Sequence, residues 1–343
     1  MIKIFKFGGA SIKDLDSIKS IGNILKKYSA AELVIVFSAM GKVTNMLEEV
    51  VKSYVQSSEH TTKHLQKVKS FHENIINELF AKDHDIFNEV NNLFIEIEWV
   101  LEEESHQDYA YIYDQIVSIG EFLSTKIMSA YLDQIGFHNT YKDARDLIRT
   151  DNSYRNAKVD WDTTTMFIKD TISDKHTITQ GFIGGTSENF TTTLGREGSD
   201  FTAAILAFCL DAKEVIIWKD VPGMMNADPK YFVDAELLNI VSYDEAIELA
   251  FYGAKVIHPK TIQPLKNKDI PLQIRSFLTP NMQGSIITNN RKDNIEKPYF
   301  IIKEDQILIS ISNEQLDFIV ETHISHIFSI LAKHQVGVNL MQN

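Results

Sequence analysis

The sequence predicts an α/β fold in which a mainly parallel sheet is covered by helices on both faces. Three observations support this prediction: apolar runs of strand length alternate with helical stretches, one run is continuous and typical of a doubly buried strand, and turns containing glycine follow the runs. Ligands of such folds bind beyond the carboxyl ends of the strands. The residues in these turns are therefore the first candidates for function.

The first predicted strand covers residues 2–7. The Gly8-Gly9 turn that follows leads into a helix. We expect this helix to begin near Ser11, because Ser11 and Asp14 have the spacing of a capping box.

The second predicted strand, 33–37, is the continuous apolar run. A loop at 38–42 leads from it into a helix that contains Thr44 and Leu47. The stretch from 50 to 136 then has a helical pattern, with polar and charged residues on the outer faces.

The second half of the chain returns to alternating strands and helices. Three further strands are predicted, at residues 177–183, 215–218 and 272–277. Between the last two, Ser242 and Glu245 form a capping box that opens a helix, and Gly253 marks the end of this helix.

The charged stretch 289–297 is interpreted as a linker. The elements predicted beyond it are a strand at 306–312, a helix at 323–333 and a strand at 336–340. These elements are too few to close a core, so we expect that the chain stops inside a second domain. The predicted domains are 1–292 and a partial one at 298–343.

The composition is that of a globular protein with no general affinity for nucleic acid. Of the 343 residues, 44% are hydrophobic and 24% are charged. A net charge of −13 argues against nucleic-acid binding, which needs a cationic face. The sequence has no signal-peptide pattern and no apolar run near the roughly 18 residues that span a bilayer. The single cysteine, Cys209, excludes an intrachain disulfide, and the cytoplasm is the expected compartment.

Residues 191–200, TTTLGREGSD, are the most informative segment. They combine threonines, glycines, Arg196 and Asp200 directly before an apolar helical run. The glycines allow close approach of the backbone to a ligand, the amides of a helix N-terminus favour anions, and Arg196 offers a fork for a carboxylate or phosphate. The negative charge of Asp200 would oppose a bound anion unless a metal ion or an ammonium group lies beside it. This mixture predicts a site for a small molecule of both charges; the alternative is a surface loop that ends in a capped helix.

Both standard phosphate-binding fingerprints are absent from the sequence. Lys6 shares a sheet face with Ile4, so it either pairs with an anion or reaches solvent at the strand end. Asp220 follows a predicted strand in a turn that fits nucleotide contacts and ordinary turn chemistry equally well. Lys255 lies just beyond Gly253, where it either serves a ligand or contacts the helix carbonyls.

Together these segments resemble the aspartate kinases of the amino-acid kinase superfamily. Residues 6–11, KFGGAS, are similar to K-F-G-G-T-S, and residues 38–45, SAMGKVTN, to S-A-M-G-x-x-T-N. Residues 191–200 are similar to T-T-T-L-G-R-G-G-S-D, and residues 252–259, YGAKVIHP, match Y-G-A-K-V-[LI]-H-P. Shorter matches are SIGE at 118–121, DAR at 143–145 and GFIG at 181–184. Several of these motifs are particular to this family.

The resemblance implies a three-layer αβα sandwich, the amino-acid kinase fold, followed by an incomplete ACT-like segment of ferredoxin-like type. It implies that ATP, with Mg²⁺, phosphorylates the β-carboxylate of L-aspartate to 4-phospho-L-aspartate, the first step of lysine, threonine and methionine biosynthesis. The implied partners are these small molecules, without nucleic acid or membrane, and the full-length form is expected to be a homodimer. The short ACT-like segment predicts weak or absent inhibition by lysine or threonine.

The resemblance also implies which residues form the site. The catalytic residues are expected to be Lys6, Asp200 and Ser38. The substrate is expected to contact Arg196 through its α-carboxylate and Glu121 through its ammonium, with Thr44 and Ser199 beside them. The nucleotide is expected to contact Gly8, Gly9, Asp220, Met225, Lys230 and Lys255. No metal ion held by the protein alone is expected.

Several positions depart from the family pattern. Ala10 and Lys219 stand where threonine is usual, Glu197 replaces a glycine, Met225 a tyrosine and Lys230 an arginine. Two alternatives to an aspartate kinase remain open. One is an amino-acid kinase acting on glutamate or carbamate, and the other is a catalytically weak, amino-acid-binding regulatory subunit.

Overall fold

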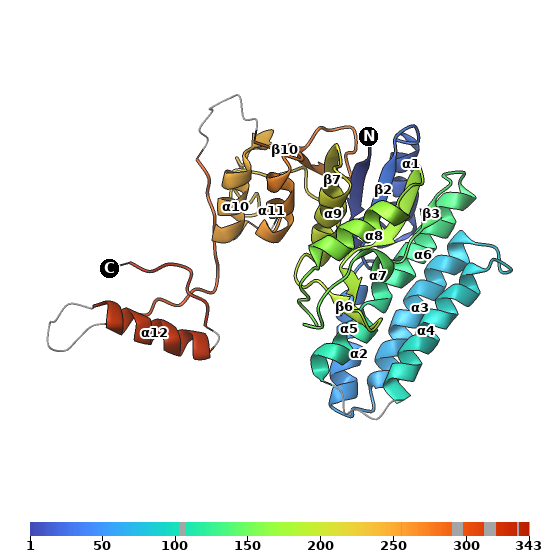
Figure 1. Ribbon diagram of the computed structural model, residues 1–343, viewed down its shortest axis with the longest axis horizontal. Helices are drawn as coiled ribbons and strands as arrows, with labels where there is room; N and C mark the ends of the chain where they lie inside the picture. The colour runs from blue at the N-terminus through green and yellow to red at the C-terminus, as the bar shows by residue number, and fades with distance from the viewer. Residues whose placement is uncertain (103–107, 255, 290–297, 312–319, 335, 343) are drawn as a thin grey trace.

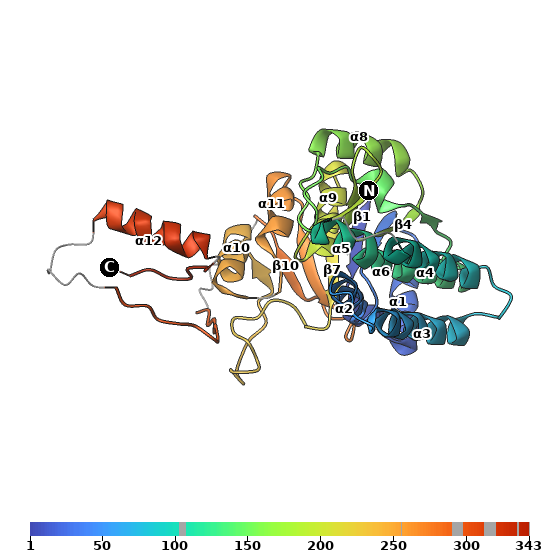
Figure 2. The same cartoon turned by 90° about the horizontal axis from the view of Figure 1, so that it is seen from below.

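The computed structural model describes residues 1–102, 108–254, 256–289, 298–311, 320–334 and 336–342. Its centre is an eight-stranded sheet with helices on both faces (Figures 1 and 2). The strands, in spatial order, are β3 (Thr140–Tyr141), β4 (His176–Gln180), β2 (Leu33–Phe37), β1 (Lys3–Phe7), β7 (Glu214–Lys219), β9 (Leu272–Ser276), β10 (Ser285–Ile287) and β8 (Ile240–Val241). All pairings are parallel except that of β9 with β10.

Helices cover both faces of this sheet, which confirms the predicted three-layer αβα sandwich (Figure 2). One face is covered by α1 (Leu15–Lys26), α2 (Val43–Val55), α3 (Thr61–Leu79), α4 (Ile86–Glu102), α5 (Tyr109–Val117) and α6 (Ile119–Gln134). The other face is covered by α8 (Trp161–Thr171), α9 (Gly198–Cys209), α10 (Tyr243–Tyr252) and α11 (Pro259–Asn267). The short helix α7 (Ala144–Leu147) adjoins the small antiparallel hairpin of β5 (Ile183–Gly185) and β6 (Thr191–Thr193).

The alternation of side chains along β1 divides the core into two parts. Phe5 and Phe7 pack into the cluster under α1 to α6, whereas Ile4 packs into the cluster under α8 to α11. Because successive side chains of a strand point to opposite faces, Lys6 shares the face of Ile4. A charged side chain is thus directed at α9.

The parallel register brings the strand ends to one edge of the sheet. Phe7 pairs with Phe37 of β2 and with Trp218 of β7, and Phe37 pairs in turn with Gln180 of β4. The turns that follow these strands therefore adjoin one another. This arrangement places the glycine turn after β1, the loop after β2 and the end of β7 side by side.

Two predicted boundaries are wrong in detail. Ser11 belongs to a 3₁₀-helix, η1 (Gly9–Ile12), and α1 begins after Asp14, which caps it by accepting a hydrogen bond from the Ser17 amide at 2.9 Å. The predicted strand 177–183 is interrupted, because Phe182 has a φ of 72° that no strand permits. The capping box of Ser242 is confirmed, as are the helix and its end at Gly253.

The C-terminal region agrees with the prediction only for its helix, α12 (Glu321–Lys333), which has no buried residues. The predicted strands at 306–311 and 336–340 are wrong, since these residues are exposed and have no regular structure. A strand needs a backbone ladder with a second strand, and these segments form none with a described residue, although the Asn339 side chain donates a hydrogen bond to that of Gln306. Residue 312 and most of the predicted linker, 290–297, lie outside the described residues.

Two further observations concern the described residues as a whole. Cys209 is fully buried in α9, as the apolar pattern of that helix predicts. No helix in the described part of the chain is long and apolar enough to cross a membrane.

Candidate active site

Lys6 and Asp200 meet at the carboxyl end of the central strand. The Lys6 ammonium lies 2.6 Å from Asp200 Oδ1, and the two side chains are 8% and 0% exposed. Burial disfavours the Asp200 carboxylate, but attraction to Lys6 and Lys219 outweighs it and lowers the pKa of Asp200. The prediction that Lys6 pairs with an anion is confirmed, and the alternative that it reaches solvent is wrong.

Lys219, the last residue of β7, approaches the second oxygen of the same carboxylate. Its Nζ atom lies 3.1 Å from Asp200 Oδ2 and 3.9 Å from Glu197 Oε2, and it donates a hydrogen bond to the Val256 carbonyl at 2.5 Å. Burial works against the charge of Lys219, but Asp200 and Glu197 overcome it and raise the pKa of Lys219. Asp200 therefore has one ammonium at each oxygen.

The Gly8-Gly9 turn lies directly beside the Lys6 ammonium. A Cβ atom on Gly8 would lie 3.4 Å from Lys6 Nζ, and one on Gly9 would lie only 2.6 Å from the Ala39 carbonyl oxygen. Glycine is thus required for this turn to pack against the loop after β2. In that loop, the Ser38 amide donates to the last carbonyl of β1 at 3.1 Å, which places Ser38 at the same edge.

Glu121 enters the site from the first turn of α6 and is 3% exposed. Gly120 lets α6 approach the loop after β2, because a Cβ atom there would already lie 3.2 Å from the side chain of Ala39. Burial raises the pKa of Glu121 to about 8, against the opposing effects of the Ala39 amide and Lys6. Its Oε2 atom is buried and has no hydrogen-bond partner among the described residues. Thr44 is half-buried in the first turn of the adjacent α2.

The loop between β6 and α9 presents Arg196, whose side chain is exposed. Gly195 and Glu197 flank it with φ angles of 76° and 54°. The left-handed region is costly for a glutamate, which gives a physical reason for the glycine that the aspartate kinase pattern has at this position. Burial and the nearby Arg196 lower the pKa of His258 at the start of α11. The Arg196 guanidinium therefore lies near the N-terminus of α11.

Two charged side chains hold β6 and this loop in place. Asp114 accepts hydrogen bonds from the amide and the hydroxyl of Thr193, each at 2.7 Å, and from the Arg155 amide at 2.9 Å. Burial raises the pKa of Asp114 to about 6, although these hydrogen bonds oppose the shift. The Lys260 ammonium donates to the Leu194 carbonyl at 2.9 Å. The sequence analysis missed Asp114, although a lone carboxylate within an apolar helix was an available signal.

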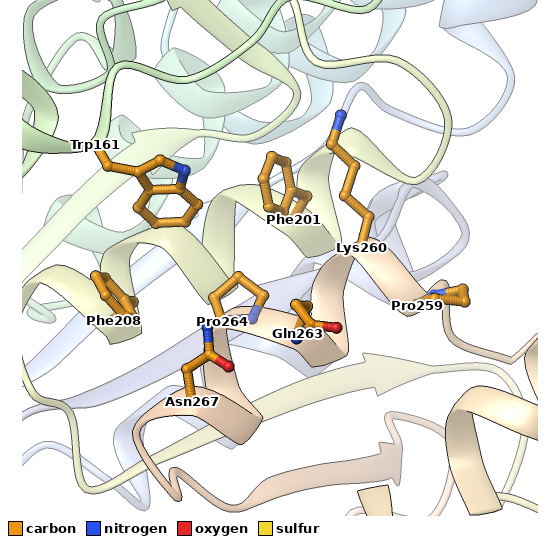
Figure 3. Close-up of a pocket in the computed structure, with 8 residues that line it drawn as sticks. All are labelled: Trp161, Phe201, Phe208, Pro259, Lys260, Gln263, Pro264 and Asn267. Atoms are coloured by element: carbon orange, nitrogen blue, oxygen red, sulfur yellow. The ribbon is translucent and has the colours of Figure 1, made fainter. Parts of the chain in front are cut away.

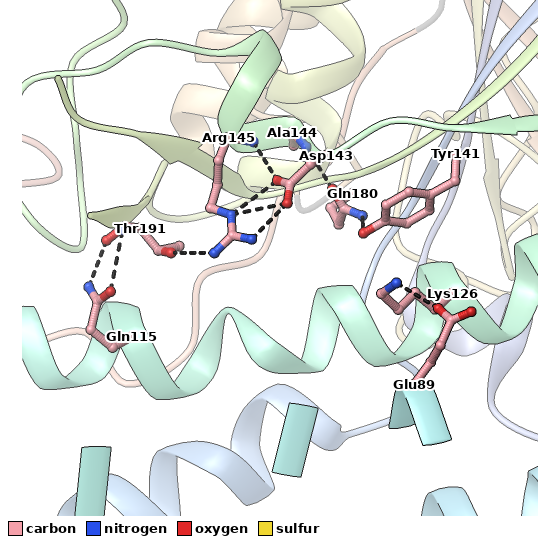
Figure 4. A network of polar contacts seen from close by, with 9 residues as sticks. All are labelled: Glu89, Gln115, Lys126, Tyr141, Asp143, Ala144, Arg145, Gln180 and Thr191. Atoms are coloured by element: carbon pink, nitrogen blue, oxygen red, sulfur yellow. Dashed lines mark hydrogen bonds and ion pairs between the residues drawn. The ribbon is translucent and has the colours of Figure 1, made fainter. Parts of the chain in front are cut away.

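A second polar network joins the β5–β6 hairpin to the helical layer (Figure 4). Arg145 pairs with Asp143 at 2.7 Å and donates to the Thr191 hydroxyl at 3.5 Å. The Gln115 side chain donates to the Thr191 carbonyl at 2.8 Å. The DAR motif therefore anchors the strand that leads to Arg196.

The predicted nucleotide residues are only partly brought together. Asp220 directly follows β7 and is exposed at the same edge as Lys6. Met225 is half-buried and forms an isolated β-bridge. Lys230 is exposed, and its ammonium donates to the hydroxyl of the adjacent tyrosine at 3.1 Å instead of joining Lys6. Lys255 lies outside the described residues.

A separate groove of about 600 Å³ opens between α8, α9 and α11 (Figure 3). Its wall is mainly aromatic and aliphatic and consists of Trp161, Phe201, Phe208, Pro259, Lys260, Gln263, Pro264 and Asn267. None of the predicted site residues that the structure describes lines this groove. It is therefore distinct from the site around Lys6.

The structure thus gathers most predicted residues at one edge of the sheet. Lys6 and Asp200 form its centre, with Gly8, Gly9, Ser38 and Glu121 around them. Ser199, next to Asp200 in α9, packs against Gly181, since a Cβ atom on Gly181 would overlap its side chain. Lys219 joins the centre although the sequence marked it only as a departure from the family pattern.

Comparisons with known proteins identify the family of this chain. The model of the amino acid kinase family matches residues 1–276. Lysine-sensitive aspartokinase 3 of Escherichia coli is 30% identical over 344 residues, which cover 99% of this chain and 76% of the relative. Chloroplastic aspartokinase 2 of Arabidopsis thaliana is 32% identical, over 84% of this chain and 54% of the relative.

Solved structures give the same result. Escherichia coli aspartokinase III, in complex with lysine and aspartate, superposes with a TM-score of 0.83 and 28% identity, over 100% of this chain and 77% of that protein. The aspartate kinase of Clostridium acetobutylicum has a TM-score of 0.71 and 25% identity, over 86% of this chain and 64% of that protein. The chain is accordingly a member of the amino acid kinase family and, within it, of the aspartokinases.

Proposed function

We propose that this chain transfers the γ-phosphoryl group of Mg-ATP to the β-carboxylate of L-aspartate. The products are ADP and 4-phospho-L-aspartate, the first intermediate of lysine, threonine and methionine biosynthesis. The observation that carries this proposal is the buried Lys6–Asp200 pair, which lies where the glycine turn, the loop after β2 and the N-terminus of α9 meet. It provides a cation at the point where two anionic substrates have to approach each other.

The reaction needs charge and position more than it needs a base. A carboxyl group with a pKa of about 3.9 is already ionised at neutral pH, so the acceptor oxygen can attack the γ-phosphorus directly. The bond between the γ-phosphorus and the bridging oxygen breaks, and ADP leaves with the electron pair. Catalysis then consists of aligning the two groups and stabilising the charge on the transferring phosphoryl group.

We assign the phosphoryl-stabilising role to Lys6. Its ammonium lies beside the Gly8-Gly9 turn, where backbone amides can approach a phosphate closely. Ser38 adds a hydroxyl at the same edge, and Asp200 keeps Lys6 in place. The low exposure of Lys6 strengthens its interaction with a phosphoryl group, because little water screens it.

We assign aspartate binding to Arg196 and Glu121. Arg196 is exposed on the loop before α9, where its fork can hold the α-carboxylate in a bidentate pair. Glu121 has a buried oxygen without a hydrogen-bond partner among the described residues, which suits a substrate ammonium. Thr44 and Ser199 complete this side of the site.

We assign nucleotide binding to the segment after β7. Asp220 begins it at the edge of the sheet, and Met225 and Lys230 follow in the same segment. Lys255 is included from the family motif alone. Mg²⁺ enters with ATP as part of the substrate, since this ion is commonly held by phosphates and water with few protein ligands.

An assay of acyl-phosphate formation tests the proposed function. The protein is incubated with Mg-ATP and L-aspartate, and hydroxylamine traps the product as a coloured hydroxamate. We expect turnover with aspartate and at least about tenfold less with glutamate or carbamate. Faster turnover with one of these acceptors would favour the other amino-acid kinases. Calorimetric binding of aspartate without any turnover would favour a regulatory subunit.

We further propose that residues 298–343 are part of an ACT-like regulatory module and that residues 1–292 form the catalytic domain. The support is α12, which follows the kinase core and carries exposed apolar side chains such as Phe328 and Ile330. Apolar helix faces of this kind are buried when a module is complete or when two copies associate. A homodimer, measured by analytical ultracentrifugation, is the expected outcome.

A further inference from the structure

Lys219 lies at the centre of the site, but the proposed phosphoryl transfer assigns it no role. Its ammonium touches three segments at once: Asp200 on α9, Glu197 on the acceptor loop and the Val256 carbonyl before α11. The Asp200 and Val256 contacts are at hydrogen-bond distance, whereas Glu197 lies at the longer range of an ion pair. Lys219 is therefore a largely buried crosslink between β7, α9 and the segment before α11.

The charges around Asp200 show what this crosslink does. Lys6 from β1 and Lys219 from β7 each face one oxygen of the fully buried carboxylate, and the charges of Glu197 and Asp220 also act on Lys219. Glu121 lies on the other side of Lys6, whose charge lowers the pKa of Glu121 against the effect of burial. If Lys6 turned to a phosphoryl group while Asp200 had no other partner, an uncompensated carboxylate would remain buried, which is strongly unfavourable.

Two of the departures from the aspartate kinase pattern are in contact here. Lys219 replaces a threonine and Glu197 replaces a glycine, and their charged atoms lie 3.9 Å apart. Glu197 retains the left-handed backbone of a glycine, with a φ of 54°. Lys219 thus offsets the added negative charge of Glu197 beside the site of an acidic substrate.

We propose that Lys219 is a positioning residue for phosphoryl transfer, which holds Asp200 paired and in place so that Lys6 can move to the transferring phosphoryl group. This inference rests on the proposed function. Lys219 acts through Asp200 and through the loop that carries Glu197. It also ties the end of β7, where the nucleotide segment begins, to the helix that faces the acceptor.

The test compares three variants of the whole chain. Lys219→Gln removes the charge but keeps a polar side chain, and Lys219→Arg keeps the charge. Lys3→Met is the matched control, because Lys3 Nζ lies 2.7 Å from Glu214 Oε1 and joins the same two strands at their opposite ends. Each variant is characterised by kcat, by the KM values for aspartate and ATP, and by the pH dependence of kcat.

We expect Lys219→Gln to lower kcat about 10- to 100-fold with less than about threefold change in either KM. The acid limb of its kcat profile should move to higher pH, because Asp200 loses one of its two cations. Lys219→Arg should restore most of the rate, and Lys3→Met should match the wild type. In an Asp200→Asn background, Lys219→Gln should change kcat less than about twofold, because its effect runs through Asp200.

A readout that does not require turnover separates this inference from the proposed function. The thermal unfolding midpoint is measured as a function of pH. In Lys219→Gln, the fall of this midpoint at acid pH should begin at a higher pH than in the wild type, and in Lys3→Met it should begin at the same pH. An unchanged onset of this fall, an unchanged kcat or an increase confined to the KM for ATP would overturn the role of Lys219. A wild type that forms no acyl phosphate from aspartate would overturn the proposed function alone, since the unfolding measurement would still decide about Lys219.

Discussion

The Asp114 carboxylate accepts hydrogen bonds from both the amide and the hydroxyl of Thr193, each at 2.7 Å. This contact joins α5 to the short strand β6, which has only three residues and pairs with a strand that is equally short. The buried Asp114 carboxylate is therefore one of the anchors that set the position of the following loop, with Arg196. The acceptor side of the site is anchored from the helical layer.

Replacing Asp114 by Asn tests this anchor. An amide group cannot accept at both of its ends, so one donor of Thr193 or Arg155 loses its partner in a buried place. We expect the free energy of unfolding, measured by urea denaturation, to fall by about 1–3 kcal/mol. The KM for aspartate should rise. Asp108→Asn, at an exposed position before the same helix, is the control, and equal effects of the two substitutions would contradict the anchoring role.

Replacing Lys6 by Met should abolish most turnover while the fold persists. The substitution keeps the apolar length of the side chain and removes the cation that faces the phosphoryl group, a change that typically costs about 100- to 1000-fold in rate. Asp200 retains Lys219 as a partner, so the circular dichroism spectrum should stay unchanged. A normal kcat in the hydroxamate assay would exclude Lys6 from the mechanism.

Replacing Arg196 by Ala should raise the KM for aspartate far more than that for ATP, because the guanidinium is proposed to bind the α-carboxylate. Removal of one charge-assisted bidentate pair commonly costs about 1.5–3 kcal/mol, or roughly 10- to 150-fold in affinity. Arg196→Lys should recover only part of this loss, since an ammonium lacks the planar fork. Equal increases in both KM values would refute the assignment.

Aspartate binding should depend on pH through Glu121. With a pKa of about 8, this carboxyl group is mostly protonated at pH 7, whereas pairing with a substrate ammonium requires its ionised form. The KM for aspartate should therefore fall as the pH rises from 7 to 8.5. Glu121→Gln should raise this KM and remove its pH dependence, and a wild-type KM that is constant over this range would contradict the pairing.

The same group makes a prediction for stability. The folded pKa of Glu121 lies above its ordinary value of 4.5, so the folded protein holds the proton more tightly than the unfolded chain. The stability that this proton contributes is complete below about pH 4.5 and is lost as the pH rises through 8. In Glu121→Gln, the thermal unfolding midpoint should depend less on pH between these two values than in the wild type. An identical slope of the unfolding midpoint against pH in the variant and the wild type would contradict this interpretation.

Local sequence patterns were sufficient to predict those helices and strands that are specified by their own residues. The central strands β1, β2 and β7 are apolar runs that only a doubly covered sheet can bury, and α10 has its capping box in the sequence. The failures have the opposite cause. Residues 306–311 and 336–340 have the composition of strands, but pairing is a property of two segments, and these segments form no β-ladder with a described residue.

The sequence by itself determined the longer strands of the sheet, β1, β2, β4, β7 and β9, but not the short strands β3, β8 and β10, and it predicted the turns where a ligand would bind. For Lys6 it left two possibilities, a partner anion or solvent at the strand end, because a buried ammonium is too costly alone. Only the tertiary structure decided that this anion is Asp200, that Lys219 shares it, and that Asp114 holds the strand before them. These contacts join residues that are distant in the chain, and the register of parallel strands and the packing of α9 determine them, since no local pattern encodes a distance between side chains.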